Sequence, residues 1–183
     1  MAKKMLKTRE IVYAAFFVGV TVVLGFFIIP VQPVPVTGQS MGPMLAGSVL
    51  GGKLGALSMI VFDLLVAAGA PVLSGGRGGL GILLGPTGGY IVSWPLAAYI
   101  SGKIVEKSRR KGLGVYIQAN IIGGVVIVYL IGALWLAFIQ GLDLKTAFVE
   151  GALIFLPGDA VKVFAASWVA SVFNRINPLN AKG

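Results

Sequence analysis

The sequence predicts an all-α integral membrane protein with six transmembrane helices, and three observations support this fold class. Of the 183 residues, 57% are hydrophobic and 11% are charged, whereas soluble proteins average about 45–50% apolar and about 25% charged residues. A transmembrane helix needs about 20 apolar residues, so the length allows roughly five to seven crossings. The stretch from Ile121 to Ile139 is apolar at successive positions, unlike the alternating strands of a membrane β-barrel. We expect a single transmembrane domain over residues 1–183.

The first predicted helix covers about residues 10–29 and ends before Pro30. A basic segment precedes this helix, but the apolar run is too long for the core of a signal peptide, so we expect it to be retained. Residues 30–40 carry three prolines at near-alternate positions. Proline removes backbone donors and favours extended backbone, which predicts a stiff loop.

Two helices at about 41–50 and 54–68 follow, separated by a Gly-Gly-Lys turn. A helix as short as the first of these spans only about half of the hydrocarbon core. Such a helix is tolerated in a membrane only where other helices or a cavity cover its ends.

Residues 69–89 form a glycine-dense connection, and most of the chain after it is predicted to be helical. Three helices are expected, at about 90–104, 115–139 and 146–173. Pro157 and Gly158 interrupt the last helix, because proline removes a backbone donor.

The positive charges predict the orientation of the chain in the membrane. With six spans, both termini lie on the same side, and twelve of the fifteen Lys and Arg residues fall on that side. Positive residues favour the cytoplasmic side, so we expect a plasma-membrane protein with cytoplasmic termini and with its glycine- and proline-rich loops outside. The net charge of +9 is then explained by topology and gives no reason to expect nucleic acid as a partner.

Several classes of chemistry are excluded by composition. The chain has no cysteine and no histidine, which excludes disulfides, Cys/His metal sites and Ser-His-Asp hydrolysis. An aspartyl enzyme would need a pair such as Asp63 and Asp159, which share no catalytic sequence context, so we expect no enzyme. A P-loop is absent, and the match of Gly76-x-Gly78-x-x-Gly81 to a dinucleotide fingerprint lacks the required strand–turn–helix context. Any use of ATP therefore needs another polypeptide.

Asp159 and Lys162 are the most informative charges because both fall within an apolar run. A central Asp or Lys costs about 2.5–3.5 kcal/mol on membrane-insertion scales. Three residues apart on a helix, the two side chains share one face and can reach each other. Pro157 precedes them, as at the broken helices where transporters place binding sites. The pair either binds a ligand or locks two helices together.

Three other isolated charged residues, Asp63, Glu150 and Arg77, lead to less specific predictions. Asp63 stands alone between apolar residues, where an acid most often caps a neighbouring helix or lies near an interface. Glu150 is expected at the outer interface. Arg77, between pairs of glycines, either meets an anionic ligand or is an ordinary loop charge.

The first helix carries a small-xxx-small spacing at Ala15 and Gly19. Small residues at this spacing let another helix approach closely. The default explanation is that this surface packs against another helix of the same chain. The more specific alternative is that it is a docking face for a partner subunit.

Three blocks of the sequence resemble the BioY family, the biotin-binding S components of energy-coupling factor transporters. They are VPVTGQSMGPMLAGSVLGGKLGALS, GAPVLSGGRGGLGILLGPTGGYIVSWPLAA and FLPGDAVKV, at Val34–Ser58, Gly69–Ala98 and Phe155–Val163. The resemblance implies an S-component-like bundle of six helices that binds biotin with high affinity from outside. It also implies delivery inward with a transmembrane coupling subunit and ABC-type ATPases that use the ATP, so the chain itself would bind no cofactor or metal.

The resemblance also implies a set of site residues. The LPGDxxK block maps the biotin-contacting acid and base onto Asp159 and Lys162, while Ala15 and Gly19 correspond to the docking motif, with glycine where alanine is common. Trp94, Tyr90 and the region of Met41 and Met44 are expected to supply apolar walls. The expected substrate-binding residues are Gln39, Gly76, Arg77, Gly88, Tyr90, Asp159 and Lys162.

A second hypothesis is a stand-alone transporter, either facilitative or coupled to an ion carried by Asp63, Glu150 or Asp159. Inverted repeats are typical of that class, and none is evident between the two halves of the chain.

Overall fold

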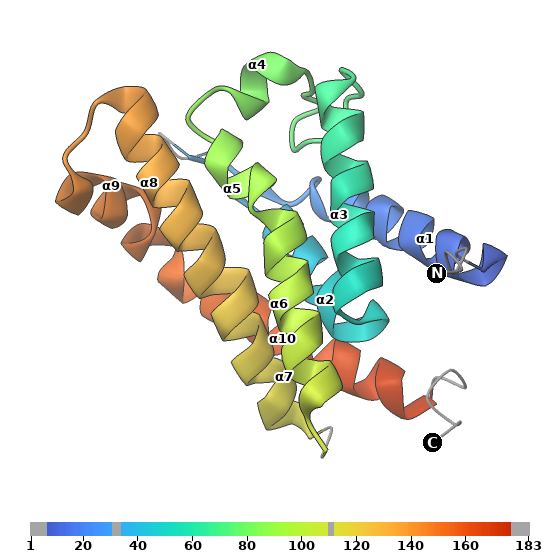
Figure 1. Cartoon of the computed structure of the whole chain (residues 1–183). Coiled ribbons are helices and arrows are strands. Elements are labelled where there is room, and N and C mark those ends of the chain that lie inside the picture. The colour runs from blue at the N-terminus through green and yellow to red at the C-terminus, as the bar shows by residue number, and fades with distance from the viewer. Residues whose placement is uncertain (1–6, 31–33, 110–111, 177–183) are drawn as a thin grey trace, which may run out of the picture.

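The structure is a computed structural model that describes residues 7–30, 34–109 and 112–176, with side chains described as far as Asn174. The basic residues Lys3, Lys4, Arg110, Lys111 and Lys182 lie outside the described residues. In chain order the elements are α1 (Thr8–Leu24), β1 (Ile28–Ile29), β2 (Val36–Thr37), η1 (Gly38–Ser40), α2 (Met41–Leu50), α3 (Gly52–Ala67), α4 (Leu80–Leu83), α5 (Gly88–Val92), α6 (Trp94–Lys107), α7 (Leu113–Asn120), η2 (Ile121–Ile127), α8 (Val128–Gln140), α9 (Leu144–Gly151), η3 (Leu153–Phe155) and α10 (Leu156–Ile176) (Figure 1).

The first helix is shorter than predicted, because α1 ends at Leu24 rather than at residue 29. Ile28 and Ile29 instead pair with Thr37 and Val36 in a two-stranded antiparallel ribbon. Apolar composition alone cannot distinguish these residues from a further helical turn, since the pairing partners lie within the proline-rich segment, after Pro35. The ribbon returns the chain to η1 and the start of α2.

The short helix α2 is enclosed by its neighbours, as its length requires in a membrane. It packs on α6 at Gly47, where an added Cβ would lie 2.3 Å from the carbonyl oxygen of Ala98. Polar contacts link it to the second half of the chain: Ser48 Oγ donates to Asn120 Oδ1 at 2.9 Å, and Asn120 Nδ2 donates to Ser167 Oγ at 3.0 Å. The centre of the bundle therefore lies around α2.

The glycine-dense connection contains two short helices that the sequence did not predict, α4 and the beginning of α5. The helix expected at about 90–104 therefore begins at Gly88 and bends at Ser93, whose Oγ donates to the Tyr90 carbonyl at 2.6 Å. The bend comes two residues before Pro95, which lies in the first turn of α6, where proline is compatible with a helix.

The fifth helix is continuous from Leu113 to Gln140, but its middle segment, η2, is a π-helix. Gly123 and Gly124 in that segment approach α6 and α2 closely, since an added Cβ at Gly124 would lie 2.5 Å from Met44 Cγ. A π-helical segment often marks a functional site. It leads into α8, whose Tyr129 is described below.

The last predicted helix is divided before Pro157 rather than at it. Helix α9 ends at Gly151, η3 follows, and α10 begins at Leu156. Pro157 is the second residue of α10, where the missing N–H has no intrahelical partner to lose. The proline therefore begins a helix here, and the prediction that it interrupts one was wrong.

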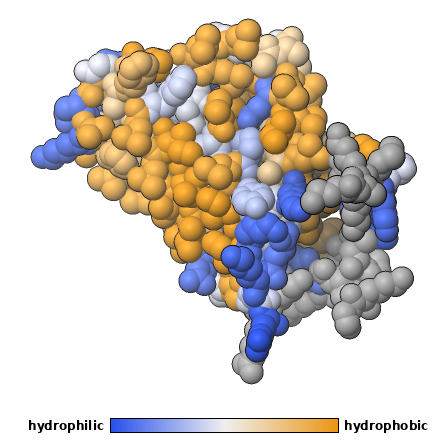
Figure 2. All heavy atoms as spheres, viewed as in Figure 1, coloured by the Kyte–Doolittle hydropathy of each residue, from blue (hydrophilic) through white to orange (hydrophobic). Residues whose placement is uncertain are grey.

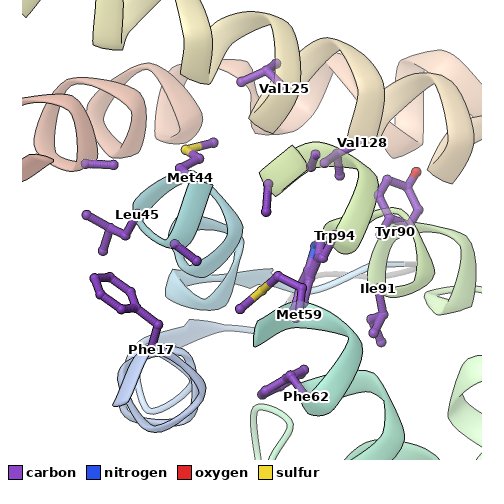
Figure 3. Packing of buried hydrophobic residues seen from close by; sticks show 14 of the residues in the cluster. Phe17, Met44, Leu45, Met59, Phe62, Tyr90, Ile91, Trp94, Val125 and Val128 are labelled. Atoms are coloured by element: carbon purple, nitrogen blue, oxygen red, sulfur yellow. The ribbon is translucent and has the colours of Figure 1, made fainter. Parts of the chain in front are cut away.

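The surface is apolar outside the core as well as within it. Figure 2 shows a broad apolar face, with hydrophilic residues at its lower end and at the edge near α9. Phe26 and Phe138 are 80% and 82% exposed. Two helical stretches, Leu113–Gln140 and Leu144–Asn174, are long and apolar enough to cross a membrane. Inside, labelled side chains including Phe17, Met44 and Phe62 fill the space between the helices (Figure 3).

The two ends of the bundle differ in character. At one end Glu106 accepts hydrogen bonds from Gly52 N at 2.8 Å and Lys103 Nζ at 2.5 Å, so the α2–α3 turn with Lys53 lies beside the end of α6. At the other end lie the α1–α2 and α3–α5 connections (Figure 1). These connections form the cavity described next.

Candidate functional site

A cavity opens between the α1–α2 connection, the α3–α4 connection and helices α5, α8 and α10. It is lined by Val34, Pro35, Val36, Thr37, Gln39, Ser40, Leu73, Ser74, Arg77, Ile82, Thr87, Tyr90, Ile91, Trp94, Gly124, Val128, Tyr129, Phe155, Asp159 and Lys162. The lining is mostly apolar with a few convergent polar groups, which is the usual character of a small-molecule site.

Asp159 and Lys162 form an ion pair on the first turns of α10 and face this cavity. Lys162 Nζ lies 2.7 Å from Asp159 Oδ1, and the two side chains are 14% and 5% exposed, respectively. The break before Leu156 places Asp159 in the first turn of α10, where the helix dipole favours negative charge. The pair is therefore held in the cavity wall by local chain geometry.

Two hydroxyl groups complete this cluster, and sequence reasoning missed both. The hydroxyl of Tyr129 on α8 donates to Asp159 Oδ2, and Lys162 Nζ donates to Ser40 Oγ at 3.1 Å. The only local signal for Tyr129 is a polar hydroxyl between the apolar residues Val128 and Leu130. The cluster joins η1, α8 and α10 around one end of the cavity.

Gln39 lines the cavity, but its side chain is engaged by the protein. Its Oε1 accepts from Ser74 N at 3.0 Å and from Ser74 Oγ at 2.9 Å, and its Nε2 donates to Val72 O at 2.8 Å and Thr21 O at 3.3 Å. An amide side chain has two donor hydrogens and two acceptor lone pairs, so its capacity is used. Gln39 ties loops together rather than presenting a free group to a ligand.

The glycine-rich connection contributes one of its three expected residues to the cavity. Arg77 is exposed, lines the cavity and donates from Nε to the Ser74 carbonyl at 3.0 Å. Gly76 adopts a positive φ of 67° in the turn before it and is not part of the lining. Gly88 is also outside the lining, because it packs so closely that an added Cβ would lie 1.7 Å from the Leu83 carbonyl oxygen.

The apolar wall includes Tyr90 and Trp94, as expected, but not Met41 or Met44. Tyr90 donates its hydroxyl to the Gly151 carbonyl at 2.8 Å, which fixes its ring in the wall. Met44 is fully buried and packs closely against Gly124, while Met41 is half-buried. The expectation that the methionines supply part of this wall was therefore wrong.

Asp63, Ala15 and Gly19, for which the sequence suggested roles, lie away from the cavity. Asp63 is not in the lining, and its Oδ1 is buried with no hydrogen-bond partner among the described residues. Ala15 and Gly19 are exposed, and an added Cβ at Gly19 would meet nothing within 4 Å. Packing within the described chain therefore does not explain the small-xxx-small spacing on α1.

Comparisons with known proteins agree with this geometry. Residues 1–178 match the model of the BioY family. The biotin transporter BioY of Rhizobium etli is 41% identical over 172 residues, covering 88% of this chain and 91% of that protein. The biotin transporter BioY of Rhodobacter capsulatus is 42% identical over 185 residues, covering 93% and 95%.

A solved structure extends the agreement to the fold. The crystal structure of the S-component for biotin from an ECF-type ABC transporter superposes with a TM-score of 0.87, at 31% sequence identity, and the match covers 94% of this chain and 96% of that one. This match confirms the all-α membrane bundle and the S-component architecture. Together with the family match over most of the sequence, it shows that the chain belongs to the BioY family.

Proposed function

We propose that this protein is the biotin-binding membrane subunit of a vitamin importer, capturing biotin outside the cell and delivering it inward with an ATP-driven coupling module. The observation that carries the proposal is the buried Asp159–Lys162 pair in the wall of a largely apolar cavity. The relatives named biotin transporters support the choice of ligand.

The ureido ring of biotin suits the Asp159–Lys162 end of the cavity. That ring presents two N–H donors and one carbonyl acceptor. Each oxygen of Asp159 already accepts one hydrogen bond and retains a further lone pair, and Lys162 has a third donor hydrogen beyond the two it uses. The carboxylate can therefore accept from ureido N–H groups while the ammonium donates to the ureido carbonyl, both as charge-assisted bonds.

The valerate carboxylate of biotin suits Arg77 at the exposed side of the cavity. Among the lining residues the charged side chains are Asp159, Lys162 and Arg77, so the cavity carries one net positive charge. Asp159 already neutralises Lys162, whereas Arg77 has no ion-pair partner among the described residues. An anionic group is costly to bury away from water. The carboxylate therefore lies at the exposed Arg77 and the neutral bicyclic head lies deep.

The exposed small residues of α1 suit a partner subunit. Ala15 and Gly19 share their helix surface with exposed apolar side chains such as Phe16 and Val12. Without an interior packing role, a small-xxx-small face in a membrane favours close approach of another helix. We assign this face to the transmembrane coupling subunit, with ABC-type ATPases supplying the energy.

The proposed orientation places both termini in the cytoplasm and the cavity outside. The connections that build the cavity lie at the opposite end of the bundle from Lys53 and Lys103. Excess positive charge favours the cytoplasmic side. The cavity then opens toward external biotin.

Calorimetry on the purified, detergent-solubilised chain tests the function. Biotin should bind tightly, at one site, with the chain alone and without ATP. Thiamine, a vitamin without a ureido ring, serves as the comparison ligand and should not compete. Biotin binding no tighter than millimolar would contradict the proposal. In proteoliposomes holding only this chain, biotin uptake that collapses with an ion gradient would instead support a stand-alone transporter.

A further inference from the structure

Gln39 is the buried link between the two loops that form the outer walls of the cavity. The residue is 2% exposed. Through Ser74 and Val72 it holds the α3–α4 connection, and through Thr21 O it holds α1. One side chain thus fixes three segments that are distant in sequence.

The local packing around Gln39 is built to admit it. An added Cβ at Gly25, at the end of α1, would lie 2.7 Å from Gln39 Nε2. The Thr21 hydroxyl donates to the Phe17 carbonyl at 2.8 Å, and the Thr21 carbonyl accepts from Gln39 Nε2 at 3.3 Å. A buried amide with all of its hydrogen bonds made specifies one arrangement, because any other would leave polar groups unpaired.

The two loops joined by Gln39 each hold a charged residue of the cavity. Ser40, the next residue in the chain, accepts from Lys162 Nζ at 3.1 Å. Ser74, which donates to Gln39 from both N and Oγ, accepts from Arg77 Nε at 3.0 Å through its carbonyl. Lys162 is therefore linked to Arg77 through Ser40, Gln39 and Ser74. Ser40 and Gln39 are joined by their peptide bond, and the other links are hydrogen bonds.

We infer that Gln39 is a positioning residue that sets the placement of Arg77 relative to the Asp159–Lys162 pair, and so determines how well the cavity recognises the ligand carboxylate. This inference rests on the proposed function. Gln39 makes no hydrogen bond to the ligand itself, since its donors and acceptors are used within the protein.

The test compares biotin with biotin methyl ester, which keeps the ring system but lacks the negative charge. Wild-type protein should prefer biotin by roughly tenfold, equivalent to about 1.4 kcal/mol. Arg77→Gln should remove the preference, because it should lower the affinity for biotin and leave the affinity for the ester unchanged. Gln39→Met has similar length but no hydrogen bonds, and it should also remove most of the preference. In the Gln39→Met background, Arg77→Gln should have little further effect on the ratio.

Ser58→Ala is the matched control. Ser58 is fully buried and donates to the Ala14 carbonyl at 2.8 Å, joining α3 to α1 away from the cavity lining. This variant should lower thermal stability but keep the biotin-to-ester ratio. Ser74→Ala provides a milder second test, because it removes one of the two Ser74 donors to Gln39, and should shift the ratio in the same direction.

The outcomes separate the inference from the proposed function. A biotin-to-ester ratio in Gln39→Met that equals the wild-type ratio, whether or not both affinities fall, would overturn the positioning role. A wild-type protein that binds neither ligand would contradict the proposed function instead. If Gln39→Met does not fold, the ratio in Ser74→Ala decides.

Discussion

Asp159 and Tyr129 meet across the cavity wall, with the Tyr129 hydroxyl donating to the Asp159 carboxylate from the helix that follows the π-helical segment. The same carboxylate pairs with Lys162 on its own helix, and Lys162 in turn donates to Ser40 of η1. This arrangement fixes the direction of both oxygens before any ligand arrives. Preorganisation of this kind lowers the ordering cost of binding.

Tyr129→Phe should weaken biotin binding by roughly 3- to 10-fold, because a hydrogen bond to a charged group contributes about 1.5–3 kcal/mol and part of that loss is recovered by water. The measurement is calorimetry in detergent. Tyr99→Phe, on an exposed tyrosine of α6, is the matched control and should leave binding unchanged. Equal affinities for wild type and Tyr129→Phe would show that Asp159 needs no support from α8.

Substitutions of Asp159 and Lys162 should have strongly non-additive effects on thermal stability. Lys162→Met leaves a buried acid without its cation, and breaking one partner of a buried pair costs about 3–5 kcal/mol. The double variant Asp159→Asn with Lys162→Met removes both charges and should recover much of that stability. Thermal unfolding of the wild type and of these variants in detergent measures the differences in stability.

Biotin binding in the same variants distinguishes a ligand site from a purely structural pair. The double variant should be stable yet bind biotin poorly, because both charged partners of the ureido ring are gone. A double variant with wild-type affinity would mean that the pair only locks helices together.

The exposed face of α1 should matter for uptake but not for folding. Gly19→Leu adds a side chain where an added Cβ meets nothing within 4 Å, so thermal stability and biotin affinity of the isolated chain should not change. Biotin uptake with the coupling subunit and ATPases should fall. Gly47→Leu is the contrasting variant, and it should destabilise the chain by about 1–3 kcal/mol through overpacking against α6. Unaltered uptake with Gly19→Leu would place the partner elsewhere.

The sequence was most informative where chemistry and spacing coincide. Asp159 and Lys162 were predictable because charges in an apolar run are costly and a three-residue spacing brings them together. The family was predictable from the blocks that contain them. The last helix was predicted to be interrupted at Pro157, which was wrong, because proline is equally compatible with interrupting a helix and with beginning one. The helix is divided before Leu156 instead.

The remaining features depend on contacts between distant segments. Nothing local to Gln39 reveals that Ser74, Val72 and Thr21 saturate its amide. Gly88 was expected at the ligand, yet the group that approaches this glycine closely is the Leu83 carbonyl. The sequence identifies which residues are special, whereas the tertiary packing decides what each of them faces.

The dissociation constant of biotin for Asp159→Asn tests the role of the Asp159–Lys162 pair in binding most directly, with Asp63→Asn as the matched control. Both are acids in helices of the bundle, but Asp159 lines the cavity and Asp63 does not. We expect Asp159→Asn to weaken biotin binding by roughly 10- to 100-fold, and Asp63→Asn to change it by about twofold or less. Wild-type affinity in Asp159→Asn, or an equal loss in both variants, would contradict this role of the pair.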